Sequence, residues 1–245
     1  MSNIDQDTFY LKTESNAFFQ RWKKNSEEII KNKKKFILRK NKKEIIKIIS
    51  KKKNLKNKNI LEIGCFTGDL LFYLRKKYKC KVYGIEPSSD ACLYSKKFFN
   101  LKLENKTLLR SKLFNFEKRN YQKYDVIICD DVLSWIDRST LLPALGIIDW
   151  MLKPNGIIFI RDFFPPKSFA YKNHHWPKKR IFNFKQLDGH KEFFLRSGKY
   201  IQQYLKIYYT EKFQKVKIKK KSSSVWCDTI LKKLQGFSHH IEKIK

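Results

Sequence analysis

The chain has few of the residues that mark a metal centre, a disulfide framework or a membrane span. Its five cysteines are spread over 245 residues and none of them forms a CxxC pair. We therefore expect no disulfides and no metal site. No apolar run reaches the length of about 18 residues that a transmembrane helix needs, so we expect no membrane partner. The polar start, MSNIDQDTFYLKTES, lacks the pattern of a secretory signal, and we expect a cytoplasmic protein.

Acidic residues are scarce. There are 23 Asp and Glu against 55 Lys and Arg, which gives a net charge of +32. Residues 60–166 are nearly balanced, with 17 basic and 12 acidic side chains, so the basic excess lies on the two flanks. Such an excess is typical of nucleic-acid binding. However, Lys outnumbers Arg about five to one, and Arg is the better phosphate ligand. A nucleic-acid partner is therefore kept as an alternative and is not favoured.

The hydrophobic pattern predicts an α/β fold. Continuous apolar strands are predicted at 60–63, 79–87, 126–129 and 156–163, with a weaker one at 101–109. Helical patterns lie between them, at 70–74, 88–99 and 141–152. Strands that are apolar on both faces and alternate with helices are typical of a parallel sheet covered on both sides. With closing strands at 200–213, 215–221 and 225–234, we expect a Rossmann-like, mostly parallel sheet of seven strands.

Two segments fall outside this pattern. Residues 1–56 are predicted to form an N-terminal helical extension, with an aromatic helix near 14–24 and a long or broken one over 26–51. Residues 57–245 are predicted to form the main domain, with an irregular insertion at about 164–187 after the fifth strand and a short helix at 188–200. The extension and the insertion are both rich in aromatic and basic residues, and we expect them to act as lids.

The stretch NILEIGCFTGDLLFYL, residues 59–74, joins a strand to a helix through a turn bracketed by Gly64 and Gly68. It is not the dinucleotide fingerprint GxGxxG, because Phe66 stands where a pyrophosphate needs glycine. Acids at the predicted strand ends (Glu62, Asp69, Asp130 and Asp131) would also repel a pyrophosphate. They favour a ligand with a cationic centre. S-adenosylmethionine, with its sulfonium and ammonium groups, fits this description.

Four motifs in order, ILEIGCFTGDL, VYGIEPSS, YDVIICDDVLSWID and LKPNGIIFIRD, resemble those of the class I S-adenosylmethionine-dependent methyltransferases. The resemblance covers about residues 57–163, and VWCDTILKK is similar to the last strand of that fold. It implies a methyltransferase enzyme with S-adenosylmethionine as cofactor. It also implies the cofactor-binding residues, which are Glu62, Gly64, Cys65, Gly68, Glu86, Pro87, Leu113 and Asp130.

Within that set the resemblance gives each residue a place. Glu86 matches the acid that binds the ribose hydroxyls, and Pro87 lies near the adenine. Asp130 lies beside the sulfonium. The chain departs from the family pattern after the third strand, where the contact to the adenine amine is assigned only to the backbone of Leu113.

The motifs do not name a base, and methyl transfer needs mainly alignment of the nucleophile with the methyl group. The candidates for a catalytic role are His174, His175 and Asp162, which follow the fifth strand, and Arg161 stands beside Asp162. Each of them also has a structural alternative as a polar or loop-capping residue.

The sequence does not identify the acceptor. Asp130-Asp131-Val132-Leu133 differs from the motifs of adenine amino and cytosine C5 methyltransferases, and DDVLSWID resembles enzymes that act on small molecules. We expect a small-molecule acceptor, such as a sugar or a secondary metabolite. The alternatives are an RNA methyltransferase that uses its basic flanks and a non-catalytic binding protein on the same fold.

Overall fold

A computed structural model describes residues 5–25, 38–111, 121–176, 178–179, 181–209 and 225–235. The chain forms two compact units, residues 1–114 and 115–245. Within the described residues, no helix is long and apolar enough to cross a membrane.

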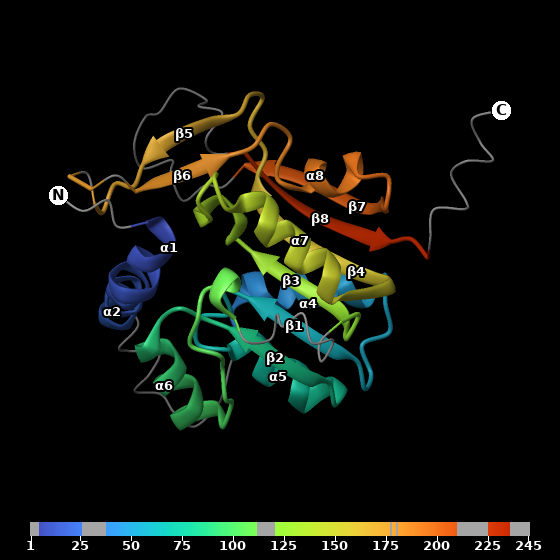
Figure 1. Cartoon of the computed structure of the whole chain (residues 1–245). Coiled ribbons are helices and arrows are strands. Elements are labelled where there is room, and N and C mark those ends of the chain that lie inside the picture. Colours follow the sequence, from blue (N-terminus) through green and yellow to red (C-terminus); the bar gives the residue numbers. More distant parts are fainter. Residues whose placement is uncertain are drawn as a thin grey trace. The chain divides into compact units, whose positions relative to one another are not determined.

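The first unit is built on two parallel strands, β1 (Asn59–Ile63) and β2 (Lys81–Ile85), paired from Asn59 with Lys81 to Ile63 with Ile85. Helix α5 (Asp69–Tyr78) connects them, and α6 (Ser89–Phe99) follows β2 (Figure 1). Ser88 caps α6, because its hydroxyl accepts a hydrogen bond from the Ala91 N–H at 3.1 Å. This βαβα arrangement confirms the prediction for these segments.

Helices precede β1 in this unit, at α1 (Gln6–Phe9), a π-helical turn η1 (Tyr10–Glu14), α2 (Ser15–Asn25) and α4 (Lys40–Ser50). The N-terminal helix thus begins earlier than the predicted residue 14, since the Asp5 side chain caps it by accepting from the Thr8 N–H at 2.8 Å. Four isoleucines of α4 are buried (Ile45, Ile46, Ile48, Ile49). Residues 26–37 of the helix predicted over 26–51 lie outside the described residues.

The predicted third strand at 101–109 is wrong. Only an isolated bridge between Ile85 and Glu104 remains, followed by a 3₁₀ turn, η2 (Leu108–Arg110). The chain turns immediately after the bridge, because the Lys106 N–H donates to the Glu104 carbonyl at 2.9 Å. A strand cannot continue through such a turn.

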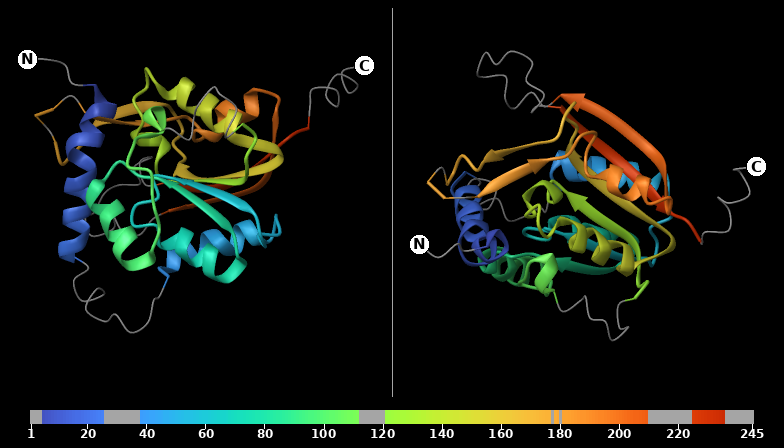
Figure 2. Two further views of the ribbon diagram at one scale, coloured as in Figure 1. Left: turned by 60° about the horizontal axis from the view of Figure 1, so that its bottom comes forward. Right: turned by 45° about the horizontal axis from the view of Figure 1, so that its top comes forward.

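The main sheet of the second unit has four strands in the order β3 (Tyr124–Asp130), β4 (Leu152–Phe163), β8 (Val225–Lys233) and β7 (Tyr200–Tyr209). β3 and β4 are parallel, and the pairs β4–β8 and β8–β7 are antiparallel. Between them lie a 3₁₀ turn, η3 (Leu133–Trp135), α7 (Leu141–Met151) and α8 (Lys191–Arg196), with α8 beside β7 (Figure 2). The mixed α/β class is thereby confirmed.

The first unit has two strands, and the main sheet of the second unit has four. The predicted count of seven is therefore not reached in the described part of the chain. One predicted closing strand, at 215–221, lies outside that part. The strand predicted at 156–163 begins earlier, because β4 begins at Leu152. Its pairing with β3 is irregular between Leu152 and Ile157, where Asn155 has φ 59°.

The insertion is not irregular as predicted. It contains an antiparallel hairpin, β5 (Phe169–Lys172) and β6 (Phe182–Lys185), which forms a small separate sheet (Figure 1).

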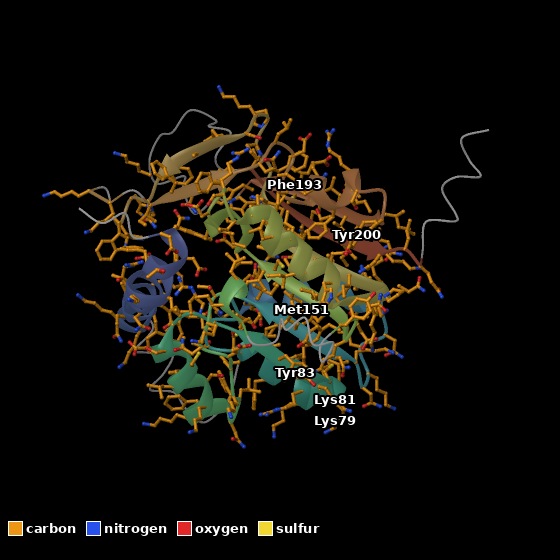
Figure 3. All side chains as sticks on the ribbon, in the orientation of Figure 1. Lys79, Lys81, Tyr83, Met151, Phe193 and Tyr200 are labelled. Atoms are coloured by element: carbon orange, nitrogen blue, oxygen red, sulfur yellow. The ribbon has the colours of Figure 1, made fainter. Side chains whose placement is uncertain are left out.

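The core of the second unit lies along β3 and β4, where Val126–Cys129 and Ile157–Ile160 are at most 1% exposed. Tyr200, which is labelled in Figure 3, is the first residue of β7, and its hydroxyl donates to Asp149 Oδ1 at 2.7 Å. The continuous apolar strands read from the sequence are therefore buried strands.

Candidate functional site

The glycine-bracketed turn at residues 64–68 is present and is tied to the end of β2. The Gly64 and Cys65 N–H groups both donate to the Ile85 carbonyl, at 2.9 and 3.2 Å. Gly68 has φ 72° and no room for a side chain, because a Cβ would come within 2.9 Å of Ser95 Oγ. It is the N-cap of α5 and offers no side-chain hydrogen bond to the helix. The first N–H groups of α5 are therefore left to bind a ligand anion such as a carboxylate.

Glu86 lies directly after β2 and is 5% exposed. Its Oε2 accepts from the Phe66 N–H and its Oε1 from the Ser88 N–H, both at 2.8 Å. Burial raises the pKa of Glu86 to about 7, although the two backbone hydrogen bonds oppose this shift. Each carboxylate oxygen has a second lone pair, so the group can still accept two hydrogen bonds from a pair of hydroxyls.

The acids near the turn are neutralised, which the sequence did not reveal. Glu62 Oε1 lies 2.7 Å from Lys42 Nζ, and both side chains are buried. Asp69 binds Arg39 through two contacts of 3.1 and 3.3 Å. These acids would therefore repel a pyrophosphate less than the sequence suggests. What still disfavours a pyrophosphate is the turn itself, where Phe66 stands in place of a glycine.

Helix α2 packs on this turn. The ring of Phe66, which has φ 53°, lies 5.2 Å from the Trp22 ring and 5.3 Å from the Phe18 ring, measured between centroids. Asn16 Oδ1 accepts from the Ser88 hydroxyl at 2.8 Å. The residues of α2 thus hold both Phe66 and Ser88, the two residues whose N–H groups bind Glu86.

Three other residues of this unit were predicted to bind the cofactor: Cys65, Pro87 and Leu113. Cys65 is fully buried, and burial raises the pKa of its thiol well above the usual value, so it is not a nucleophile. The Pro87 carbonyl accepts from Asn105 Nδ2 at 2.8 Å. Leu113 lies outside the described residues.

In the second unit, Asp130 lies at the end of β3, 3.5 Å from Arg161 Nη1. Arg161 pairs with Asp228 on the neighbouring strand through two hydrogen bonds of 2.7 and 2.9 Å. Its guanidinium pKa is raised, because the carboxylates outweigh the effect of burial. Asp131 follows with φ 56°, and its Oδ1 is buried without a hydrogen-bond partner.

Asp162 is buried and accepts from three donors. These are the Phe163 N–H at 2.7 Å, the His190 N–H at 3.1 Å, and His190 Nδ1 in a short contact. His190 was not singled out from the sequence. It follows the Asp188-Gly189 turn, and nothing in the local pattern connects it to a residue 28 positions earlier.

His174 and His175 are exposed in the turn after β5, with ring centroids 3.9 Å apart. The His175 N–H donates to Asn173 Oδ1 at 2.9 Å. Asp162 is bonded to His190 and to neither of these histidines. Among the described residues, no group of three His, Cys, Asp or Glu side chains could hold a metal ion.

The profile of a methyltransferase domain family matches residues 24–206, which is most of the chain. The chain belongs to this methyltransferase family. The expected resemblance to the class I methyltransferases is thereby confirmed, and with it the expectation of an enzyme.

The methyltransferase is also similar to a curated protein of Rickettsia prowazekii (strain Madrid E), the uncharacterized protein RP028. The two are 31% identical over 108 residues, which are 43% of each chain. The chain thus spans less than half the length of this relative.

Solved structures share the fold of the methyltransferase. One is a Burkholderia thailandensis 1,6-didemethyltoxoflavin-N1-methyltransferase with bound 1,6-didemethyltoxoflavin and S-adenosylhomocysteine. Its TM-score is 0.62 at 10% identity, with 96% of this chain and 93% of that one covered. An S-adenosylmethionine-dependent methyltransferase of Methanosarcina mazei gives 0.58 at 15% identity, with 77% and 98% covered. One of Archaeoglobus fulgidus gives 0.57 at 14%, with 88% and 100% covered. At these identities the likeness confirms the Rossmann-like fold.

Proposed function

We propose that this methyltransferase transfers a methyl group from S-adenosylmethionine to a small-molecule acceptor by in-line displacement, in the cytoplasm. The observation that carries the proposal is Glu86. It is a buried carboxylate at the end of β2, fixed by two N–H groups, with a free lone pair on each oxygen. The two ribose hydroxyls of the cofactor are donors that match it.

The other cofactor residues of the first unit follow from the turn. The N-terminus of α5, reached through Gly68, would bind the carboxylate of the methionine part. Gly64 and the Cys65 backbone shape the turn, since the Gly68 N–H donates to the Cys65 carbonyl at 2.9 Å. Glu62, which is paired with Lys42, would lie close to the ammonium group of the methionine part. Pro87, adjoining Glu86, would lie near the adenine.

Asp130 in the second unit, and Leu113, keep the places that the family resemblance gives them, beside the sulfonium and at the adenine amine. The cofactor supplies a methyl group that is already activated, so the chain needs mainly to align the acceptor and accept a proton. Asp162 would orient His190, and His174 and His175 remain candidates for contact with the acceptor from the exposed turn.

A small acceptor is supported by two observations. Helix α2 closes over the cofactor turn with aromatic side chains, which suits a small, enclosed site. A structural neighbour of nearly full coverage carries the small molecule 1,6-didemethyltoxoflavin.

The test is calorimetry with S-adenosylhomocysteine. The wild type should bind it, and Glu86→Ala should weaken binding by at least about tenfold, because two charge-assisted hydrogen bonds are lost. Asp90→Asn is the control, since it removes an acid from the same helix terminus that Glu86 precedes. Equal affinity of the wild type and Glu86→Ala would refute the ribose assignment.

The basic flanks support a second candidate, methylation of RNA. The observation is the net charge of +32, concentrated outside residues 60–166. Phosphate contacts would make RNA binding fall steeply with salt. Filter binding of total RNA between low and physiological salt tests this, and an absence of binding at low salt excludes it.

A further inference from the structure

Strand β6 of the β5–β6 hairpin turns its polar residues inward and its phenylalanines outward. On β6, Asn183 and Lys185 are buried, at 0% and 2% exposure, whereas Phe182 and Phe184 are half-buried. A strand with one buried face normally turns its apolar side chains inward. The register of β6 instead buries Asn183 and Lys185 and leaves the two phenylalanines half-buried.

Asn183 is the central residue of this inner face. Both of its side-chain polar atoms, Nδ2 and Oδ1, are buried, and neither has a hydrogen-bond partner. Asn173, in the same insertion and also 0% exposed, differs, because its Oδ1 accepts from the His175 N–H at 2.9 Å. A buried donor and acceptor left unsatisfied destabilise a fold, and native proteins rarely keep them without a ligand or water.

Aromatic rings surround this face. The register pairs Tyr171 with Asn183 and Phe169 with Lys185, so all four side chains project to one side of the hairpin. Lys185 Nζ lies 3.3 Å from the centroid of the Phe163 ring and 5.0 Å from that of Tyr171. Flat rings beside an amide suit a planar ligand.

The surroundings disfavour an ion. Burial lowers the pKa of Lys185 to about 8, although Asp131 and Asp162 oppose the shift. Burial also raises the pKa of Asp131 well above its usual range, and the charges of Asp130 and Asp162 add to this. β6 lies against the η3 turn that follows Asp131. This environment favours the neutral forms of both an ammonium and a carboxyl group. It would therefore bind an uncharged molecule more readily than a charged one.

We propose that the inner face of the β5–β6 hairpin binds the methyl acceptor, and that the acceptor is an uncharged planar molecule with an adjacent N–H and C=O. These two groups would pair with Oδ1 and Nδ2 of Asn183, and Asp131 Oδ1 is available for a third contact. The inference rests on the proposed small-molecule methyl transfer and names the chemical class of the acceptor.

The first test is stability. Asn183→Leu keeps the size of the side chain and removes the two unsatisfied atoms, so we expect the melting temperature to stay the same or to rise by about 2–4 °C. Asn173→Leu is the matched control and should lower it, because that variant loses a turn-capping hydrogen bond. If Asn183→Leu melts lower than the wild type or fails to fold, Asn183 has a structural role and the proposal is wrong.

The second test is binding of a probe of the stated class. Uracil has the required N–H and C=O edge, and 1,3-dimethyluracil has the same ring without an N–H. In ligand-observed NMR with the full chain, uracil should give a saturation-transfer signal and 1,3-dimethyluracil should not. Asn183→Leu should weaken uracil binding by at least about tenfold. Equal signals from both probes, no uracil signal at millimolar concentration, or unchanged binding by Asn183→Leu would each overturn the proposal.

The stability test and the probe-binding test do not depend on cofactor binding. If the wild type does not bind S-adenosylhomocysteine, the proposed function fails, whatever the probes show. If it binds S-adenosylhomocysteine and Asn183→Leu retains that affinity, any failure with uracil concerns the acceptor class alone.

Discussion

The protonation of Glu86 should control cofactor affinity near neutral pH. The ribose hydroxyls donate to the carboxylate, so only the ionised form offers the full set of acceptors. Because burial raises the pKa of Glu86 to about 7, the fraction ionised changes within the range in which the protein can be studied. Most carboxylates would show no such dependence, since they are fully ionised above pH 6.

The size of the effect follows from that pKa. At pH 8 Glu86 is about nine-tenths ionised and at pH 6 about one-tenth, so affinity for S-adenosylhomocysteine should fall about tenfold between them, or about 1.4 kcal/mol. Glu86→Gln should bind about 10- to 100-fold more weakly at pH 8, because a charge-assisted hydrogen bond contributes about 1.5–3 kcal/mol. Its affinity should no longer change between pH 6 and pH 8.

Stability should change in the opposite direction. The folded pKa of Glu86, about 7, lies above its ordinary value of 4.5, so the unliganded fold binds the proton more tightly than the unfolded chain does. The resulting stabilisation is present in full below pH 4.5 and is lost as pH rises through 7, by up to about 3 kcal/mol. A bound cofactor would replace the proton with hydroxyl donors.

The assay is isothermal calorimetry at half-unit steps of pH, with chemical denaturation of the unliganded chain at the same values. Asp90→Asn should retain the wild-type pH profile. A dissociation constant that is flat from pH 6 to pH 8 in the wild type, or a sloped one that persists in Glu86→Gln, would refute the argument.

Three further substitutions test the surrounding structure. Trp22→Ala removes a ring that packs on Phe66, and it should weaken S-adenosylhomocysteine binding several-fold in calorimetry; unchanged affinity would show that α2 does not position the turn. Gly68→Ala forces a side chain to φ 72° and within 2.9 Å of Ser95 Oγ, so urea denaturation should show a loss of about 1–3 kcal/mol. Asp228→Asn removes the closer carboxylate from the buried Arg161 and leaves only Asp130 at 3.5 Å, so it should cost up to about 3–5 kcal/mol by the same measurement, whereas a neutral result would show that the Asp228 charge is not needed to hold the guanidinium.

The sequence predicted those parts of the fold whose signal is local and repeated. The apolar runs at 60–63 and 126–129 are strands because their side chains are buried on both faces, and the turn between Gly64 and Gly68 follows from positive φ values. The predicted strand at 101–109 failed because one backbone turn at Lys106 interrupts it. No feature of its composition shows that turn.

The hairpin was missed for a different reason. Each of its strands has only four residues, and their alternation, FAYK and FNFK, is hidden among prolines and basic residues. Alternation alone would also have placed Phe182 and Phe184 inside. Only the three-dimensional register shows that the buried positions are those of Asn183 and Lys185.

Lys42 shows how such a polar residue can be interpreted. It stands three and four residues before Ile45 and Ile46, so it lies on the apolar face of α4. A buried ammonium needs a partner, and the structure supplies Glu62 at 2.7 Å. Lys42 is thus a residue whose place on a buried face has a structural explanation.

Asn183 occupies the equivalent position on a strand, on the buried face by the period of two, and has no such explanation. Its donor and its acceptor are as buried as the ammonium of Lys42, yet neither has a partner in the described chain. The same physical rule that assigns Lys42 to the fold therefore assigns Asn183 to a ligand. The comparison with Asn173 isolates this difference, because the two asparagines share residue type, burial and insertion and differ in their hydrogen bonds. If Asn183→Leu and Asn173→Leu lose equal stability, the distinction between a structural and a ligand-binding polar residue fails for this hairpin.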